Sequence, residues 1–202
     1  MQLYVTLTSP YARLPRMVVL EKGLGPRVEV LEAKTRTPDS PYYQVNPSGR
    51  VPFLVRDNGQ TLEDSQLICQ YLDGLDGKPR LHMAFAQQDW AYGRLETYAR
   101  SMLDGVSVYA REMRRRENER APGIVKHEID RALRLADFWE REIGQPLMQG
   151  PPNMAQLLLL AALNFGAYAK IAELEKGRPK LIIWARRLRE LPSAKATAPG
   201  AG

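Results

Sequence analysis

Polar side chains suited to binding a ligand stand at two places in the first third of the chain. Ser9 lies in "TLTSPYAR", where a strand-like run gives way to a helical pattern, and Pro10 suits the first turn of a helix. Asp64 and Ser65 lie in "LEDSQLICQYL", directly before an apolar helical run. Residues in such positions are commonly helix N-caps and nothing more. The same positions also place hydroxyls and a carboxylate beside helix N-termini, where backbone N–H groups stabilise anions.

A third feature is the stretch "VNPSGRVPFL" at residues 45–54, in which Pro52 interrupts an apolar, β-branched run. Proline lacks a backbone N–H, so in a sheet it belongs at a strand's first residue, an edge or a bulge. Val51 is therefore biased towards an extended conformation, with backbone groups free to pair with another extended peptide. Arg50, directly before it, is suited to binding a carboxylate. The stretch predicts a peptide-binding edge.

Together these groups describe a ligand with the features of a tripeptide. Asp64 would hold an ammonium group, and Ser65 with the helix N–H groups would hold the neighbouring α-carboxylate. An extended backbone would lie beside Val51, and a second carboxylate near Arg50. The reactive group would lie near Ser9, where a hydroxyl beside the positive end of a helix would stabilise a thiolate.

Charge is unevenly distributed and argues against a nucleic-acid partner. The net charge is +6, with 8 Lys/Arg against 9 Asp/Glu in residues 1–77 and 21 against 14 in residues 78–202. The densest basic stretch, "REMRRRENER", has glutamates interleaved at spacings that allow helical ion pairs. It carries no aromatic residues on which bases could stack. We interpret it as a solvated helix face.

Cysteine and histidine usage excludes several other kinds of site. The one cysteine, Cys69, rules out an intramolecular disulfide, and with two histidines it makes a metal site implausible. Cys69 lies in an apolar helical stretch, where cysteine behaves as a small buried hydrophobe, so a redox role is not expected. The opening residues lack the pattern of a signal peptide, and the apolar "MAQLLLLAALNFGAYA" is interrupted by Gln156 and Asn164. We expect a cytoplasmic location and no membrane insertion.

Composition predicts two domains. Residues 1–77 alternate β-like and helical runs in the order βαβ and then ββα, with an Asp-Asn-Gly hairpin turn. Residues 78–83 are expected to be a linker, and residues 84–202 an all-α domain. Its helices are predicted at 84–115, 122–143, 153–172 and 179–190, and "PSAKATAPGAG" is expected to be a loose tail.

The segments "SPYAR", "NPSGRVPFLV" and "LEDSQLICQYL", in this order and followed by a helical domain, resemble the soluble glutathione transferases, of a bacterial-like kind with serine at the active-site position. The resemblance implies a thioredoxin-like fold for residues 1–77 and a cis peptide bond before Pro52. It also implies that Val51 pairs with the cysteine of glutathione. The glutathione-binding residues that it implies are Ser9, Arg50, Val51, Pro52, Asp64 and Ser65.

The activity implied by the resemblance is transfer of glutathione, the co-substrate, to a small, largely apolar electrophile, with a role in detoxification and a homodimeric assembly. The alternative is a non-catalytic glutathione-binding or protein-interaction module on the same fold. One departure from the family concerns the second domain, where Asn153 and Gln156 replace the usual Ser/Thr-x-x-Asp box. This pair is still able to cap a helix reciprocally.

Two assignments have competing residues. Ser9 is the favoured thiolate donor, while Tyr4 lies early in the first strand and Tyr11 already lies in the helix. The electrophile pocket is expected between the domains. Its candidate residues are Tyr11, Met102, Val106 and Tyr109, and the last three are equally consistent with ordinary core packing.

Overall fold

The computed structural model describes residues 1–76, 79–81, 90–171 and 173–199, which fall into two units. The first contains the described residues of Met1–His82 and Pro192–Gly202, and the second those of Met83–Leu191. The C-terminal residues thus belong to the first unit, whereas the sequence analysis assigned them to the helical domain. Parts of the predicted linker, 78 and 82–83, and the predicted helix start at 84 lie outside the described residues.

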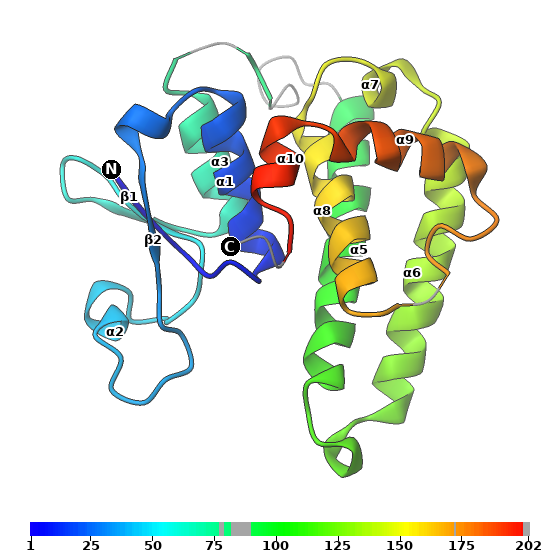
Figure 1. The fold of residues 1–202 in the computed structure, drawn as a ribbon, viewed down its shortest axis with the longest axis horizontal. Coiled ribbons are helices and arrows are strands. Elements are labelled where there is room, and N and C mark those ends of the chain that lie inside the picture. The colour runs from blue at the N-terminus through cyan, green and yellow to red at the C-terminus, as the bar shows by residue number, and fades with distance from the viewer. Residues whose placement is uncertain (77–78, 82–89, 172, 200–202) are drawn as a thin grey trace. The chain divides into compact units, whose positions relative to one another are not determined.

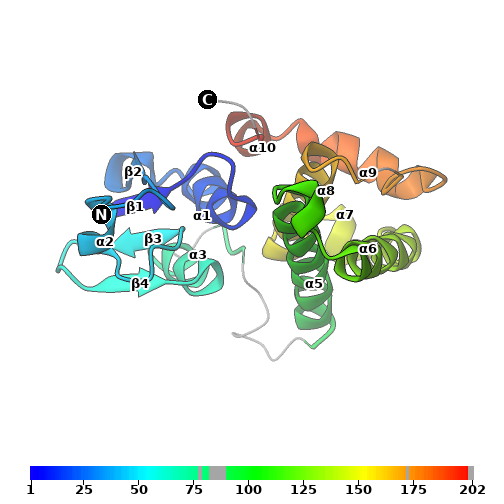
Figure 2. The ribbon, with the colours of Figure 1, turned by 90° about the horizontal axis from the view of Figure 1, so that it is seen from below.

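Four short strands form one mixed sheet in the first unit (Figures 1 and 2). In sequence order they are β1 (Gln2–Val5), β2 (Glu29–Glu32), β3 (Phe53–Val55) and β4 (Thr61–Glu63). Their spatial order is β2-β1-β3-β4, with β1 and β2 parallel and the other two pairs antiparallel. The helices of this unit are α1 (Pro10–Glu21), α2 (Tyr42–Val45), α3 (Ser65–Asp73) and α10 (Pro192–Ala196), with the short 3-10 turn η1 (Gly25–Arg27).

Successive residues of a strand point to opposite sides of the sheet, and the central strands β1 and β3 carry buried residues on both sides, whereas the edge strands β2 and β4 are more exposed. Leu3 and Leu54 are fully buried on the face that α1 and α3 cover (Figure 2). Tyr4 and Phe53 point to the other face, where they pack with Tyr42 of α2. The rings of Tyr4 and Tyr42 lie 5.5 Å apart between centroids. The predicted βαβ and ββα order is confirmed.

The C-terminal segment is an ordered part of the first unit. Residues Pro192–Ala196 form helix α10, which packs against α1 (Figure 1). Buried Arg13 donates from Nε to Thr197 Oγ1 at 3.1 Å and from Nη2 to the Ala194 carbonyl at 3.0 Å. Ser193 donates to Glu21 of α1. The prediction of a loose tail was therefore wrong for these residues, because α1 supplies the hydrogen bonds that fix them.

The second unit is helical. Its elements are α5 (Trp90–Met113), η2 (Glu117–Glu119), α6 (Pro122–Glu142), α7 (Pro146–Gln149), α8 (Met154–Tyr168) and α9 (Pro179–Arg189). The core helix α8 is buried along almost its whole length and packs against α5. Asn153 caps α8 by accepting from Gln156 N at 3.1 Å, while Gln156 Nε2 donates to the Leu147 carbonyl at 2.9 Å. The Asn-x-x-Gln pair is thus structural, but the capping is not reciprocal, because the glutamine side chain bonds to α7 and the loop after it and its Oε1 has no partner among the described residues.

The observed architecture is a thioredoxin-like domain and a helical domain, which confirms the predicted fold class. Among the described residues, no helix is both long and apolar enough to cross a membrane.

Candidate glutathione site

Strand register brings three predicted segments to the same end of the sheet. Phe53, the first residue of β3, is paired with Tyr4 of β1 on one side and with Glu63 of β4 on the other. Three segments therefore extend beyond the same end of the sheet. They are the chain that continues β1 towards Ser9, the residues before β3 and the residues after β4. The spacing of the motifs alone did not establish this convergence.

Val51 has the unpaired backbone that the predicted edge requires. Val51 is half-buried and lies outside the ladder, and its peptide bond to Pro52 is cis, as the resemblance implied. No residue in the described part of the chain forms a backbone hydrogen bond with Val51. Its N–H and C=O are therefore available to an extended peptide, which would pair as an additional strand.

The loop before this edge is held by residues that the sequence analysis did not single out. Asn46, 2% exposed, accepts from Ser48 N at 3.1 Å and donates from Nδ2 to the Arg50 carbonyl at 3.0 Å. The Tyr42 hydroxyl donates to the same carbonyl. Gly49 has φ 64°, and a Cβ there would lie 2.7 Å from a ring carbon of Tyr43, so a larger residue would be strained and would displace that ring. Asn46, which begins Asn-Pro-Ser-Gly, was the feature of the sequence that could have indicated how this loop is held.

Tyr42 remains a hydrogen-bond donor over a wide pH range. Burial raises the pKa of Tyr42 above its ordinary value, and the charges of Glu63 and Tyr4 act in the same direction, while the bond from Asn46 opposes them. The phenol is therefore protonated at neutral pH. It keeps the Arg50 carbonyl bound, which orients the backbone that leads into Val51.

Ser9 is the N-cap of α1. Its Oγ accepts a hydrogen bond from Ala12 N at 3.2 Å, and its backbone φ of −77° and ψ of 120° are extended. A hydroxyl has two lone pairs and one proton, so capping occupies an acceptor site and leaves the proton available for donation. Capping and donation to a sulfur atom are thus compatible, although the sequence analysis treated them as competing interpretations.

The two tyrosine alternatives lie in different surroundings. Tyr4 packs against Tyr42 on the sheet face opposite α1, and its hydroxyl lies 3.4 Å from Gln2 Oε1. Tyr11 is half-buried in the first turn of α1, two residues after Ser9. Tyr11 is therefore the nearer alternative to Ser9 along the chain.

Asp64 and Ser65 lie at the start of α3. Asp64 Oδ1 caps the helix by accepting from Gln66 N at 2.7 Å and Leu67 N at 3.3 Å. Its backbone φ is +80°, which is unfavourable for a non-glycine residue and typical of functional positions. Ser65 is 3% exposed, and no described residue is hydrogen-bonded to its Oγ. The second carboxylate oxygen of Asp64 and the hydroxyl of Ser65 are thus unused by the fold.

Arg50 has an exposed side chain that forms no ion pair with any described residue. Its backbone N donates to Ser48 Oγ at 3.2 Å. The backbone is therefore fixed, while the guanidinium is available to a carboxylate.

The remaining pocket candidates belong to the other unit. Met102 and Val106 on α5 are fully buried, and Tyr109 is 6% exposed. Val106 packs beside Gly166 of α8. These positions favour the core-packing interpretation for Met102 and Val106. In the described residues, no group of three or more His, Cys, Asp or Glu side chains is arranged to hold a metal.

Comparison with known proteins relates this geometry to one family. Residues 3–80 match the model described as "Glutathione S-transferase, N-terminal domain". The matched segment contains every candidate residue of the sheet-end site. The part of the chain that holds the site is therefore similar to the N-terminal domain of the glutathione S-transferases.

Several known proteins are similar over most of the chain, among them the following three. The uncharacterized GST-like protein YibF of Escherichia coli (strain K12) is 24% identical over 85% of this chain and 85% of its own. Glutathione S-transferase 2 of Saccharomyces cerevisiae is 26% identical over 96% and 88%. A crystal structure of a glutathione transferase family member from Pseudomonas fluorescens Pf-5, with bound glutathione, is 26% identical, with a TM-score of 0.87 over 98% of both chains.

Proposed function

We propose that this protein is a glutathione transferase that activates the thiol of glutathione for attack on a small, largely apolar electrophile. The observation that carries the proposal is the unpaired backbone of Val51, at the sheet end where unused polar groups of Ser9, Asp64 and Ser65 also lie. The relative from Pseudomonas fluorescens with bound glutathione supports the choice of ligand.

In this proposal each part of glutathione has a partner. The free oxygen of Asp64 binds the γ-glutamyl ammonium, and Ser65 Oγ binds the adjacent carboxylate beside the N-terminus of α3. The cysteine backbone pairs with the backbone of Val51, whose conformation is restricted by Pro52. The glycine carboxylate lies near Arg50. The sulfur lies near Ser9, whose proton is free for donation. Tyr11 would line the adjacent electrophile site.

Chemically, the site must favour thiolate over thiol. An ordinary cysteine thiol has a pKa of about 8.5, and each unit of lowering corresponds to about 1.4 kcal/mol. A hydrogen bond from Ser9 and the N-terminus of α1 both favour the charged form. The thiolate then attacks the electrophilic carbon, the leaving group departs with the bonding electrons, and the thiol proton is released to solvent. No resident metal or cofactor is needed for this step.

Two measurements test the proposal together. Isothermal titration with glutathione is expected to give saturable binding, and a generic aryl halide is expected to be conjugated at a rate well above the reaction without protein. Binding without turnover would contradict the transferase and support the non-catalytic module. Absence of binding would contradict both the transferase and the glutathione-binding module, and would favour the protein-interaction module.

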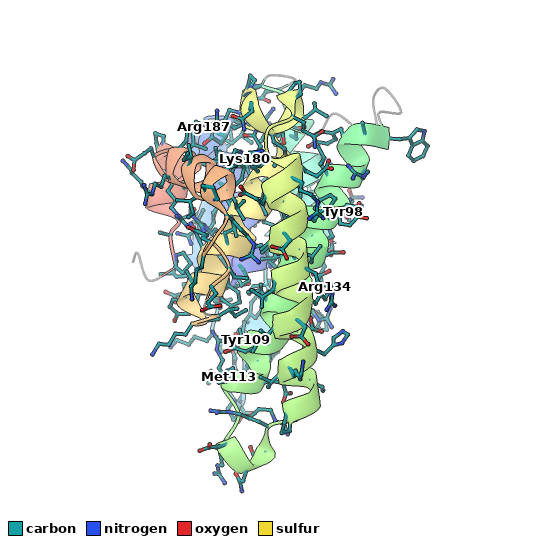
Figure 3. All side chains as sticks on the ribbon, turned by 90° about the vertical axis from the view of Figure 1, so that its right-hand side faces the viewer. Tyr98, Tyr109, Met113, Arg134, Lys180 and Arg187 are labelled. Atoms are coloured by element: carbon teal, nitrogen blue, oxygen red, sulfur yellow. The ribbon has the colours of Figure 1, made fainter. Side chains whose placement is uncertain are left out.

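We also propose a homodimer in the cytoplasm, in which buried Cys69 stays reduced. The helical unit exposes large aromatic groups on α5, where Trp90 is 82% exposed. Tyr98, labelled in Figure 3, is 39% exposed. Light scattering at micromolar concentration is expected to give about twice the chain mass of 22.9 kDa. Raised salt should weaken the assembly only modestly if apolar packing dominates the interface. A monomer mass would contradict the assignment.

A further inference from the structure

A side-chain hydrogen bond joins two segments of the sheet-end site. One segment is the edge loop, residues 46–50, which leads into Val51, and the other is the end of β4, which leads into Asp64. Strands β3 and β4 lie side by side, and their ladder ends at Glu63 (Figure 2). Beyond this point the described residues of the two segments share one hydrogen bond, which Ser48 Oγ donates to Glu63 Oε2 at 2.5 Å.

The Ser48 hydroxyl uses both its proton and an acceptor site. The proton is donated to Glu63, and Oγ accepts from Arg50 N at 3.2 Å. Because the acceptor of the proton is a carboxylate, the bond is charge-assisted and stronger than one between neutral groups. It also polarises the hydroxyl, which strengthens the bond from Arg50 N. Glu63 thus acts, through Ser48, on the residue directly before Val51.

The other hydrogen bonds of the edge loop set its shape but not its distance from β4. Asn46 accepts from Ser48 N at 3.1 Å. Asn46 Nδ2 and the Tyr42 hydroxyl both donate to the Arg50 carbonyl. All of these residues precede β3 in the chain, so their bonds hold the loop to α2. Among the described residues, the bond to Glu63 is the one that relates the loop to the segment before α3.

Glu63 reaches the edge loop because of its place in β4. Residues directly opposite each other in an antiparallel pair lie on the same face of the sheet. Glu63 is opposite Phe53, which packs with Tyr42 of α2, so the half-buried side chain of Glu63 lies on the α2 side. The next residue, Asp64, caps α3. A bond at Glu63 therefore acts directly beside Asp64.

We propose that Ser48 and Glu63 are positioning residues that set the spacing between the Val51 backbone and the clamp formed by Asp64 and Ser65. The spacing would select the length of the γ-glutamyl chain, and this inference rests on the proposed function. In glutathione, the methylene groups of that chain separate the amino-acid head from the cysteine. A site of fixed spacing favours one length, whereas a loop that is free to move adjusts to several.

The competing explanation is that Glu63 acts through its charge, as an additional carboxylate that attracts the ligand's ammonium group. Such an attraction would raise the affinity for every peptide with the same head group, whatever the length of its chain. It would also not require the hydroxyl of Ser48. The two roles therefore predict different responses to peptide length and to the removal of each side chain.

The test measures affinities for three thiol peptides by calorimetric titration. β-Aspartyl-cysteinyl-glycine, glutathione and δ-(α-aminoadipyl)-cysteinyl-glycine carry the same head group, thiol and charges, and each is longer than the one before by a single methylene. The wild type is expected to bind glutathione about tenfold or more tightly than either homologue. The reason is that one methylene changes binding by about 10- to 200-fold in a closely fitting pocket.

Variants that break the bond should flatten this length dependence. Glu63→Ala and Ser48→Ala are each expected to raise the dissociation constant for glutathione by about three- to tenfold and to reduce its preference over the homologues to about threefold or less. The double variant should lose no more than Ser48→Ala alone, because the two residues act through one bond. Glu63→Gln keeps an acceptor and Ser48→Thr keeps a hydroxyl, so both should retain the preference.

Two controls separate positioning from stability. Thr61→Ala changes an exposed residue at the other end of β4, and it should leave all three affinities unchanged even if the melting temperature falls. Hydrogen exchange without ligand supplies a readout that does not depend on glutathione. Glu63→Ala should speed the exchange of Arg50 N–H, because its acceptor, Ser48 Oγ, is no longer oriented.

Several results would overturn the proposal and leave the proposed function intact. These are equal binding of the three peptides by the wild type, an unchanged preference in both Glu63→Ala and Ser48→Ala, and unchanged exchange of Arg50 N–H in Glu63→Ala. Weaker binding of all three peptides by Glu63→Gln, but not by Ser48→Ala, would overturn it in favour of the charge role. A wild type that binds none of the peptides would instead contradict the proposed function, and this inference with it.

Discussion

Ser9→Ala is expected to lower turnover with an aryl halide by about ten- to a hundredfold while changing glutathione affinity by only a few-fold. A bond directed at sulfur is strongest when charge resides there, so its loss affects the reacting state more than the bound ground state. Steady-state kinetics combined with glutathione titration separates these effects.

A control variant must separate the loss of the hydroxyl donor from the loss of the helix cap, because Ser9 also caps α1 by accepting from Ala12 N. Loss of an N-cap costs about 1 kcal/mol for alanine but only a few tenths for glycine. Ser9→Gly should therefore lose turnover as Ser9→Ala does, and Ser9→Thr, which keeps a hydroxyl, should retain much of it. Unchanged turnover in Ser9→Gly would reject Ser9 and favour Tyr11 or a backbone amide as the thiolate donor.

The head-group clamp carries the second large expected effect. Asp64→Ala and Ser65→Ala should each weaken glutathione binding by about ten- to a hundredfold, since a charge-assisted hydrogen bond is worth roughly 1.5 to 3 kcal/mol. Calorimetric titration measures the change. Thermal melting without ligand must accompany it, because loss of the cap at α3 alone would cost about 1 kcal/mol.

Asp64→Asn is the matched variant. Its amide oxygen would still accept from Gln66 N and Leu67 N, and asparagine tolerates positive φ, so the helix start is preserved while the negative charge is removed. A glutathione analogue lacking the γ-glutamyl amine should bind the wild type weakly and be nearly indifferent to Asp64→Asn. Equal losses for the analogue and for glutathione would show that Asp64 acts through the fold.

Local patterns predicted the parts of this site that depend on neighbouring residues. Pro52 indicated the unpaired edge at Val51, and Ser9 and Asp64 were recognised as helix starts because capping chemistry is local. The convergence of these segments follows from strand register, which was not deduced from motif spacing. The bond from Tyr42 to the Arg50 carbonyl joins residues eight positions apart through a turn whose geometry the sequence did not predict.

Long-range contacts explain what the sequence did not predict. The segment after Pro192 has the composition of a loose tail, but Arg13, 184 positions from Thr197, fixes it to α1. On α5, apolar residues at helical spacing form the same sequence pattern whether they line a ligand pocket or pack in a core. Only the full burial of Met102 and Val106 favours packing for them.

The pKa of the bound thiol tests the central claim most directly. The ultraviolet absorbance of the thiolate, followed against pH for protein saturated with glutathione, is predicted to give a midpoint at about 5.5 to 7.5, against about 8.5 for an ordinary cysteine. The same titration of Ser9→Gly should move the midpoint upward. Bound glutathione whose thiol titrates at about 8.5 or above would contradict the proposed activation.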